Sequence, residues 1–566
     1  MNTLKKVVIT HKQALTKKYK ASGLADIQAA LKRLQIVDAT RGIDTRIEYL
    51  DAPSKKSIPS VAAASNEREC KEAIDALYKA YRSPDYLMIL GAGDVVPHQH
   101  LTNPLRDGDD DVNVPSDLPY ACDAPYSKKI DAFLGPARAV GRLPDVLRSH
   151  DVAQLIAVID EAAQFRKTHD KKRFVVSARV WRGATKANIR KVFGASGAIK
   201  YSPADAPPWS VAALSASLHF INCHGASADA RFFGEPDDFP TSHESSNLIG
   251  QVARGSIVTA ECCFGAQLYS PNLPELPIGI ANTYLLEGAA GYCGSTNVAY
   301  GGSTARERCA ADVLCTQFLA AVVKRATTGR ALLQARQELV AASSGALDPF
   351  DLKTLAQFLL LGDPSLRPFG VPTGDVAIVG SSKGAVKIKA QTVLGALPKL
   401  LTHAVHVARR RKLRLRGDEL ARTTLFASRE AGSAPPSLHE ALAQRLSAEG
   451  LTPGAALQFG TELPDEPAAS DSSKPGAKSK AMAAKAMAKR KSAAAEKVQV
   501  VFSQELTGRS LEGARRARRK TMAVGAGGEA QVLDPPVAHA KVAPRAAVVA
   551  RTRGNEVLSY RLVWSK

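Results

Sequence analysis

Two short motifs place a histidine and a cysteine beside glycines: Asn222-Cys223-His224-Gly225 and Glu261-Cys262-Cys263-Phe264-Gly265. A thiol needs a base or a positive neighbour to become a nucleophilic thiolate near neutral pH, and His224 can serve Cys263 in this way. The backbone N–H groups of Gly225 and Cys263 could then form an oxyanion hole. The pattern predicts acyl transfer: Cys263 attacks a carbonyl, and His224 protonates the leaving group.

Adjacent cysteines leave two candidate nucleophiles. Cys263 is preferred because it lies two residues after Glu261 and two before Gly265, which we expect to allow a sharp turn. Side chains alternate along a strand, so Cys262 should point to the opposite face.

Two alternatives stay open. His219 is a rival base, although it lies in the middle of an apolar run and no glycine follows it. Free cysteines are often buried, so Cys223, Cys262 and Cys263 could equally be core thiols with His224 a satisfied strand-end histidine.

Apolar runs alternate with amphipathic segments through residue 370, which predicts an α/β fold with a mostly parallel sheet covered on both faces. His224 and Cys263 each follow an apolar run at its carboxyl end, where ligand sites form in such sheets. Two adjacent strands would therefore bring them together. Strands are expected at 6–10, 46–50, 86–90, 173–179, 217–223, 256–262 and 288–294, and helices at 23–37, 67–81, from about 246, from about 276 and over 306–342.

Several further segments carry a family resemblance. They are YLMILGAGDVVP at 86–97, Ser116-Asp117 with Tyr120, AVGRLP at 139–144, Gly294-Ser295-Thr296, and LLLGDPSL at 359–366. Together with the His-Gly and Cys motifs, they resemble the gingipain-like cysteine peptidases of clan CD, over roughly residues 80–370. The resemblance implies a caspase-like three-layer α/β/α sandwich of two subdomains, 1–150 and 151–370, with 151–370 catalytic.

The resemblance also implies the activity: endopeptidase cleavage of polypeptides through a Cys–His dyad, without metal or organic cofactor. Relatives cleave after Arg or Lys, which requires an acid in the S1 pocket. Asp117, Asp123 and Asp131 are candidates by position, and Ser295 is a further candidate for the substrate pocket.

The C-terminal third differs in composition. It holds 33 Lys and Arg against 16 Asp and Glu, so it carries most of the net charge of +22. We expect a basic region with short strands and an amphipathic helix at 371–463, a low-complexity linker at 464–496 and a small β-rich module at 497–566.

This basic region suggests two further hypotheses. The chain could cut itself between about 474 and 497. Alternatively, it could be a catalytically silent caspase-fold protein whose basic third binds nucleic acid or an acidic partner. The first residues lack an apolar signal-peptide region, and eight cysteines without CxxC spacing indicate free thiols, so we expect a cytoplasmic protein.

Overall fold

The computed structural model describes residues 3–105, 109, 111–168, 170–235, 239–271, 278–342, 347–370, 453–460, 496–503, 546–553 and 556–566. The chain divides into two compact units, of which the first contains residues 1–405 and also Trp564–Lys566. Among the described residues, no helix combines the length and the apolar character that crossing a bilayer requires.

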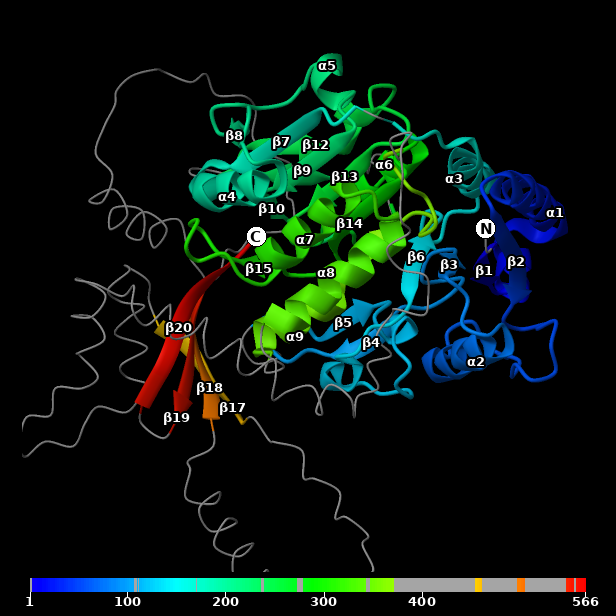
Figure 1. The fold of residues 1–566 in the computed structure, drawn as a ribbon, viewed down its shortest axis with the longest axis horizontal. Coiled ribbons are helices and arrows are strands. Elements are labelled where there is room, and N and C mark those ends of the chain that lie inside the picture. The colour runs from blue at the N-terminus through cyan, green and yellow to red at the C-terminus, as the bar shows by residue number, and fades with distance from the viewer. Residues whose placement is uncertain are drawn as a thin grey trace, which may run out of the picture. The chain divides into compact units, whose positions relative to one another are not determined.

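The first unit is built on a ten-stranded sheet in the order β2-β1-β3-β6-β16-β14-β13-β9-β7-β8 (Figure 1). Its strands are β1 (Leu4–Thr10), β2 (Ile43–Tyr49), β3 (Tyr86–Leu90), β6 (Ala139–Leu143), β7 (Arg173–Ala178), β8 (Lys200–Ser202), β9 (Leu218–Asn222), β13 (Ile257–Ala260), β14 (Gly291–Ser295) and β16 (Phe358–Leu361).

The sheet consists of two parallel halves. Neighbouring strands from β2 to β16 run parallel, as do those from β14 to β8, whereas β14 and β16 pair antiparallel. Earlier strands of the chain form one half and later strands form the other, except that β16, the last of these strands in the sequence, joins the N-terminal half. The predicted mostly parallel sheet is therefore confirmed.

Helices cover both faces of this sheet, since every residue of the central strands β3, β6, β9, β13, β14 and β16 is buried. One group of packed helices is α1 (Lys12–Thr40), α3 (Val152–Gln164) and α6 (Ile280–Leu286). The other is α4 (Arg182–Phe193), α7 (Ala311–Val323), α8 (Thr328–Ala342) and α9 (Pro349–Gln357). The remaining helices are α2 (Glu67–Ala80) and α5 (Val211–Leu214).

Short strands and turns surround the sheet. They are β4 (Gln99–Thr102), β5 (Asn113–Ser116), β10 (His224–Gly225), β11 (Arg231–Phe233), β12 (Thr241–Glu244) and β15 (Tyr300–Gly301), with 3₁₀ turns η1 (Pro119–Ala121), η2 (Ile130–Phe133), η3 (Arg179–Trp181) and η4 (Ser245–Leu248). β10, β11 and β12 form a small antiparallel sheet directly after β9.

Most predicted elements occur, with two corrections. The helix expected from about 246 is only the 3₁₀ turn η4, because Gly250 adopts a φ of 69° immediately afterwards. The helix expected over 306–342 is two helices, because Arg325 takes a φ of 72° and ends α7.

The second unit contains β17 (Pro453–Gly460), β18 (Glu496–Ser503), β19 (Ala546–Arg553) and most of β20 (Glu556–Ser565). β17, β18 and β19 pair antiparallel. Apart from these strands, the predictions for 371–463, for the linker 464–496 and for the rest of 497–566 lie outside the described residues.

Candidate active site

The two motif histidine and cysteine residues follow neighbouring parallel strands. β9 and β13 pair in register, with Ala260 opposite Ile221, so His224 and Cys263 leave the sheet at the same edge. The backbone at Gly225 lies directly on that of Cys263: a Cβ at Gly225 would stand 1.8 Å from the Cys263 carbonyl oxygen. Only glycine permits this approach, and the expectation that two adjacent strand ends meet is confirmed.

His224 is held by three neighbours. Its Nε2 lies 2.9 Å from a carboxylate oxygen of Glu235. Its ring packs on Trp181 at 4.3 Å between centroids and meets Phe239 edge-on at 5.2 Å. A carboxylate on one ring nitrogen fixes the orientation and tautomer of an imidazole and stabilises its protonated form. The contact with Glu235 uses Nε2 and not Nδ1.

Cys263 lies at the start of a tight turn. Phe264 takes a φ of 54°, so the left-handed residue is Phe264 and not Gly265, contrary to expectation. Such a conformation costs about 1–3 kcal/mol in a bulky residue, and it is held here because the Phe264 N–H donates to the Asn297 carbonyl at 3.0 Å. The Cys263 thiol contacts the Ala299 carbonyl at 3.5 Å, and the Ala299 N–H lies 3.3 Å from the sulfur.

The rival residues belong to the core. The Cys262 thiol is fully buried and faces the Ile221 carbonyl on the neighbouring strand, at 3.7 Å. His219 is also fully buried: Nδ1 lies 2.9 Å from the Tyr284 hydroxyl, and Nε2 lies 3.0 Å from the Ala216 carbonyl. Burial lowers the pKa of His219 to about 4, which makes it a poor base for catalysis at neutral pH.

A segment from the far end of the chain contacts the residues around Cys263. Ser565 and Trp564 pair antiparallel with Tyr300 and Gly301 of β15. The Lys566 N–H donates to the Ala299 carbonyl at 2.9 Å, and the Cys263 N–H donates to the Lys566 carbonyl oxygen at 3.1 Å. The predicted oxyanion donor of Cys263 is therefore occupied by the main-chain oxygen of Lys566.

The Lys566 side chain enters a buried acidic pocket. Its ammonium lies 3.3 Å from Glu261 and 3.9 Å from Asp312, and it donates to the Gly302 carbonyl at 2.9 Å. The stem passes the Trp181 ring, with the nitrogen 4.5 Å from the ring centre. All three charged side chains are fully buried.

Electrostatics in this pocket favour a bound cation. Burial alone would lower the pKa of Lys566, but Asp312 and Glu261 outweigh it and raise that pKa above the usual value. Burial and the nearby Asp312 raise the pKa of Glu261 well above its usual value. Without an ammonium group, the two carboxyls would be left buried against one another, which is costly.

Comparison with known proteins identifies the family. The model of peptidase family C25 matches residues 2–369. The chain belongs to peptidase family C25. It is therefore a cysteine-type endopeptidase with the caspase-like fold, and its substrates are polypeptides.

Solved structures of similar fold include the Arg-specific cysteine proteinase gingipain R, at 14% identity and TM-score 0.43, covering 65% of this chain and 78% of that one. A complex of the pro- and mature domains of Porphyromonas gingivalis RgpB matches at 16% identity and TM-score 0.44, covering 64% and 79%. The separase–securin complex of Saccharomyces cerevisiae matches at 14% identity and TM-score 0.27, covering 41% and 14%. No curated protein matches the chain.

In this C25 peptidase, none of the predicted pocket residues contacts Lys566. Asp117 forms a paired salt bridge with buried Arg142, at 2.6 and 2.9 Å. Asp123 is three-quarters exposed and pairs with Arg138, whereas Asp131 is exposed on η2. The Ser295 hydroxyl donates to the Cys262 carbonyl at 2.8 Å and so helps to hold the backbone before Cys263.

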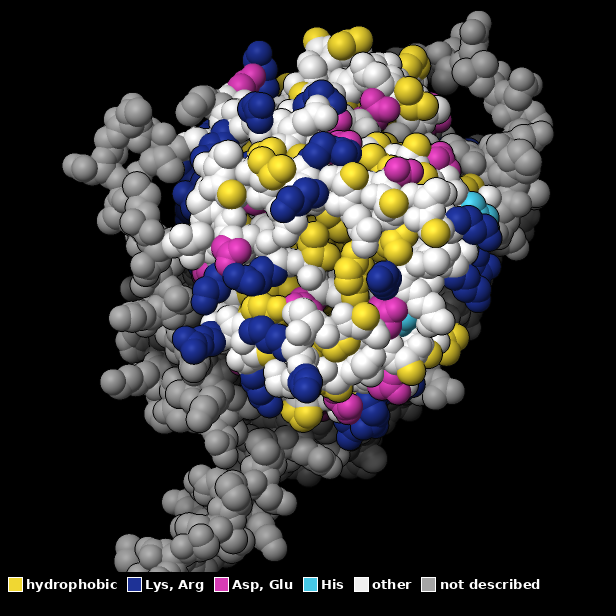
Figure 2. Space-filling view, turned by 90° about the vertical axis from the view of Figure 1, so that its right-hand side faces the viewer, with side chains coloured by type: hydrophobic (Ala, Val, Ile, Leu, Met, Phe, Trp, Pro, Cys, Tyr) yellow, Lys and Arg dark blue, Asp and Glu magenta, His cyan; other side chains and the backbone are white. Residues whose placement is uncertain are grey.

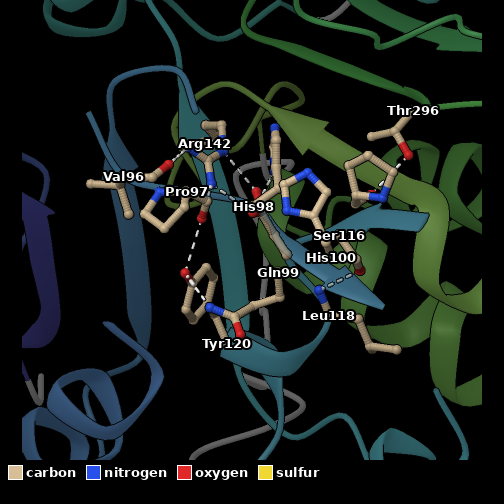
Figure 3. Close-up of polar contacts among 12 residues, drawn as sticks. Val96, Pro97, His98, Gln99, His100, Ser116, Leu118, Tyr120, Arg142 and Thr296 are labelled. Atoms are coloured by element: carbon tan, nitrogen blue, oxygen red, sulfur yellow. Dashed lines mark hydrogen bonds and ion pairs between the residues drawn. The ribbon is translucent and has the colours of Figure 1, made fainter. Parts of the chain in front are cut away.

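The motif around Asp117 is part of a buried network of hydrogen bonds and ion pairs. Figure 3 shows Arg142 reaching the turn that precedes β4, where it donates to the Val96 carbonyl at 2.7 Å. Tyr120 donates to the Pro97 carbonyl at 2.9 Å, and the His98 ring lies 2.9 Å from Asp117. These motifs therefore brace the strand ends, and the substrate-pocket role of Asp117 stays a prediction.

Sequence reasoning missed Glu235, Asp312 and Lys566. The acidic residue two positions before Cys263 was noticed, but no pattern joined Glu261 to Asp312 in α7 or to a lysine at the far end of the chain. Among the described residues, no cluster of His, Cys, Asp and Glu has the arrangement of a metal site.

Proposed function

We propose that this endopeptidase cleaves after lysine through Cys263 and His224. One observation carries the proposal: a lysine lies in the cleft as the residue before a scissile bond would. Its carbonyl accepts from the Cys263 N–H, while its ammonium contacts Glu261 and Asp312. Preorganised donors at the carbonyl and a cation pocket beside it are what acyl transfer after a basic residue needs.

The proposed chemistry uses only groups of this chain. The Cys263 thiol gives its proton to His224, and the sulfur forms a bond to the scissile carbonyl carbon. In this proposal the N–H groups of Cys263 and Gly225 stabilise the oxyanion. His224 returns the proton to the amine as the C–N bond breaks. Water then hydrolyses the thioester, which releases the carboxylate and restores the thiol.

Glu235 has a positioning role in this proposal. It contacts His224 through Nε2 and would stabilise the imidazolium that forms during the transfer. No contact between Glu235 and a substrate group is needed for this role.

The two neighbouring thiols give a matched test of the nucleophile. Cys263→Ala should reduce hydrolysis of a fluorogenic lysyl peptide to the background rate, because the attacking sulfur is gone. Cys262→Ala removes only a weak contact with Ile221 and should keep most of the activity. Circular dichroism should show both variants folded. Loss of activity in Cys262→Ala with retention in Cys263→Ala would overturn the assignment.

Three expectations stay predictions. They are the intracellular location, self-cleavage between about 474 and 497, and an anionic partner for the basic C-terminal third. The cleavage segment lies almost wholly outside the described residues. On the face shown in Figure 2, which carries α1 and the β2 edge, Lys and Arg are interspersed with acidic and apolar side chains, so the first unit offers no continuous basic surface there.

A further inference from the structure

The segment Trp564–Lys566 lies in the cleft in the manner of a bound peptide. It pairs antiparallel with β15, and the Lys566 N–H and carbonyl are both used, by Ala299 and Cys263 respectively. Adding an extended strand to an exposed edge is a general mode of peptide recognition, in which the main chain gives affinity and pockets give specificity. Here the specificity pocket holds the lysine side chain.

The same contacts cover the nucleophile. With Lys566 in place, Cys263 is only 4% exposed. Burial raises the pKa of the Cys263 thiol to about 12, so very little of it is thiolate at neutral pH. Cys263 cannot attack a substrate peptide while the main-chain oxygen of Lys566 occupies the Cys263 N–H, because the substrate carbonyl needs that donor.

Occupancy by an attached segment is difficult to displace. A tethered ligand competes at an effective concentration set by its attachment, whereas a free peptide competes only at its bulk concentration. The Lys566 ammonium also neutralises Glu261 and Asp312, so leaving the pocket uncovers a buried acidic pair. Both effects favour the occupied state.

We propose that Trp564–Lys566 is an intramolecular, substrate-like inhibitor that fills the S3 to S1 subsites and keeps the protease closed until it is displaced. This inference rests on the proposed function, because it assigns the lysine pocket to S1. It also implies that an activating event acts by withdrawing this segment and not by rearranging the dyad.

Removing the lysine charge is the direct test. Lys566→Ala in the full chain should increase both hydrolysis of a lysyl peptide and alkylation of Cys263 by iodoacetamide, each by about tenfold or more, since a loss of about 1.4 kcal/mol from the closed state gives a factor of ten. Mass spectrometry locates the alkylated residue. Lys172→Ala is the matched control, because that lysine is 79% exposed and should leave both rates unchanged.

Adding the segment back in trans tests its specificity. Acetyl-Leu-Val-Trp-Ser-Lys should inhibit the Lys566→Ala protein competitively, and the same peptide ending in glutamate should not. A lysine-ended peptide without inhibitory effect, at millimolar concentration, would show that the segment does not occupy the substrate site.

The possible outcomes distinguish a failure of the self-inhibition proposal from a failure of the proposed peptidase mechanism. The wild-type and Lys566→Ala chains could show equal rates of alkylation and of hydrolysis, while Cys263→Ala shows neither reaction. That result would overturn self-inhibition and leave the proposed function standing. Faster alkylation of Cys263 without any peptide hydrolysis would support occupancy of the cleft and overturn the proposed function. If Lys566→Ala lowers the melting temperature, Lys566→Met replaces it, because it keeps the unbranched stem and removes only the charge.

Discussion

At the scale of single residues, the lysine pocket contains two carboxyls for one ammonium group. Burial and the nearby Asp312 raise the pKa of Glu261 well above its usual value. Interacting acids titrate as a pair, so we expect the two carboxyls to contribute unequally to binding the cation. Asp312 is also held in place by the Gly302 N–H at 2.6 Å.

The two pocket variants should therefore differ. In the Lys566→Ala background, Asp312→Asn should lower kcat/KM for a lysyl substrate by about 10- to 100-fold, since bonds to charged groups contribute about 1.5–3 kcal/mol. Glu261→Gln should change it only a few-fold at neutral pH, because the raised pKa of Glu261 disfavours its charged form. The readout is the ratio of kcat/KM for lysine over norleucine at P1, which is independent of the folded fraction.

An exposed acid provides the control for this comparison. Asp131→Asn should leave the lysine preference unchanged, because Asp131 lies on the surface of η2. A larger loss in Glu261→Gln than in Asp312→Asn would show that the charge resides on Glu261. A pH series adds a second check: as the pH rises through the raised pKa of Glu261, the intact pocket gains negative charge, whereas the Glu261→Gln pocket does not.

At the scale of elements, the strand that an acidic residue follows determines whether its side chain is free to contact a substrate. Asp117 follows β5 and is sequestered by Arg142 of β6 and by His98, so it braces the strand ends. Burial, which would raise the pKa of Asp117, is outweighed by Arg142 and His98, and the pKa lies well below its usual value. A group with a depressed folded pKa stabilises the protein above the pKa of the unfolded chain, about 4, and this stability is lost as the pH falls below it.

Asp117→Asn should consequently affect stability and not specificity. Removing one partner of a buried pair costs about 3–5 kcal/mol, because Arg142 is left as an uncompensated buried charge. Urea unfolding at pH 7 measures this loss, and the difference from wild type should shrink as the pH is lowered towards 3. A change in the P1 preference of Asp117→Asn, with an unchanged free energy of unfolding, would instead support a role for Asp117 in the substrate pocket.

The elements also show how far the sequence could predict the site. Apolar runs with His224 and Cys263 at their carboxyl ends were enough to predict β9, β13 and their meeting, because that arrangement follows from local pattern and parallel pairing. The acidic pocket was not predictable, because Glu261 and Asp312 converge only through the packing of α7 on the sheet. The turn at Phe264 was assigned to Gly265 because glycine is the usual left-handed residue, and its stabilising contact with Asn297 is not visible in the local sequence.

At the scale of the whole peptidase unit, a buried ion cluster links β1 to the end of β16, which are the first and the last strands of the large sheet in chain order. Lys6 in β1 contacts Asp38 at the end of α1 at 2.5 Å and Asp363, just after β16, at 2.6 Å, and all three are fully buried. β16 joins the N-terminal half of the sheet and pairs antiparallel with β14 of the other half. The family motif around Asp363 thus secures the strand through which the two halves join.

Lys6→Met tests this connection, because it leaves two buried carboxylates without their ammonium partner. We expect a loss of about 3–5 kcal/mol in the free energy of unfolding at pH 7. Burial, which opposes ionisation, is at present outweighed by Lys6, so the pKa of Asp363 lies below its usual value and the wild type loses stability as the pH falls below about 4. Without Lys6 that pKa should rise, so the variant should instead gain stability as the pH falls from 7 towards 5. Lys6→Met combined with Asp363→Asn should recover part of the loss at pH 7, since it removes one orphaned charge. Equal stability of the single and double variants across this pH range would show that the cluster does not hold the two halves together.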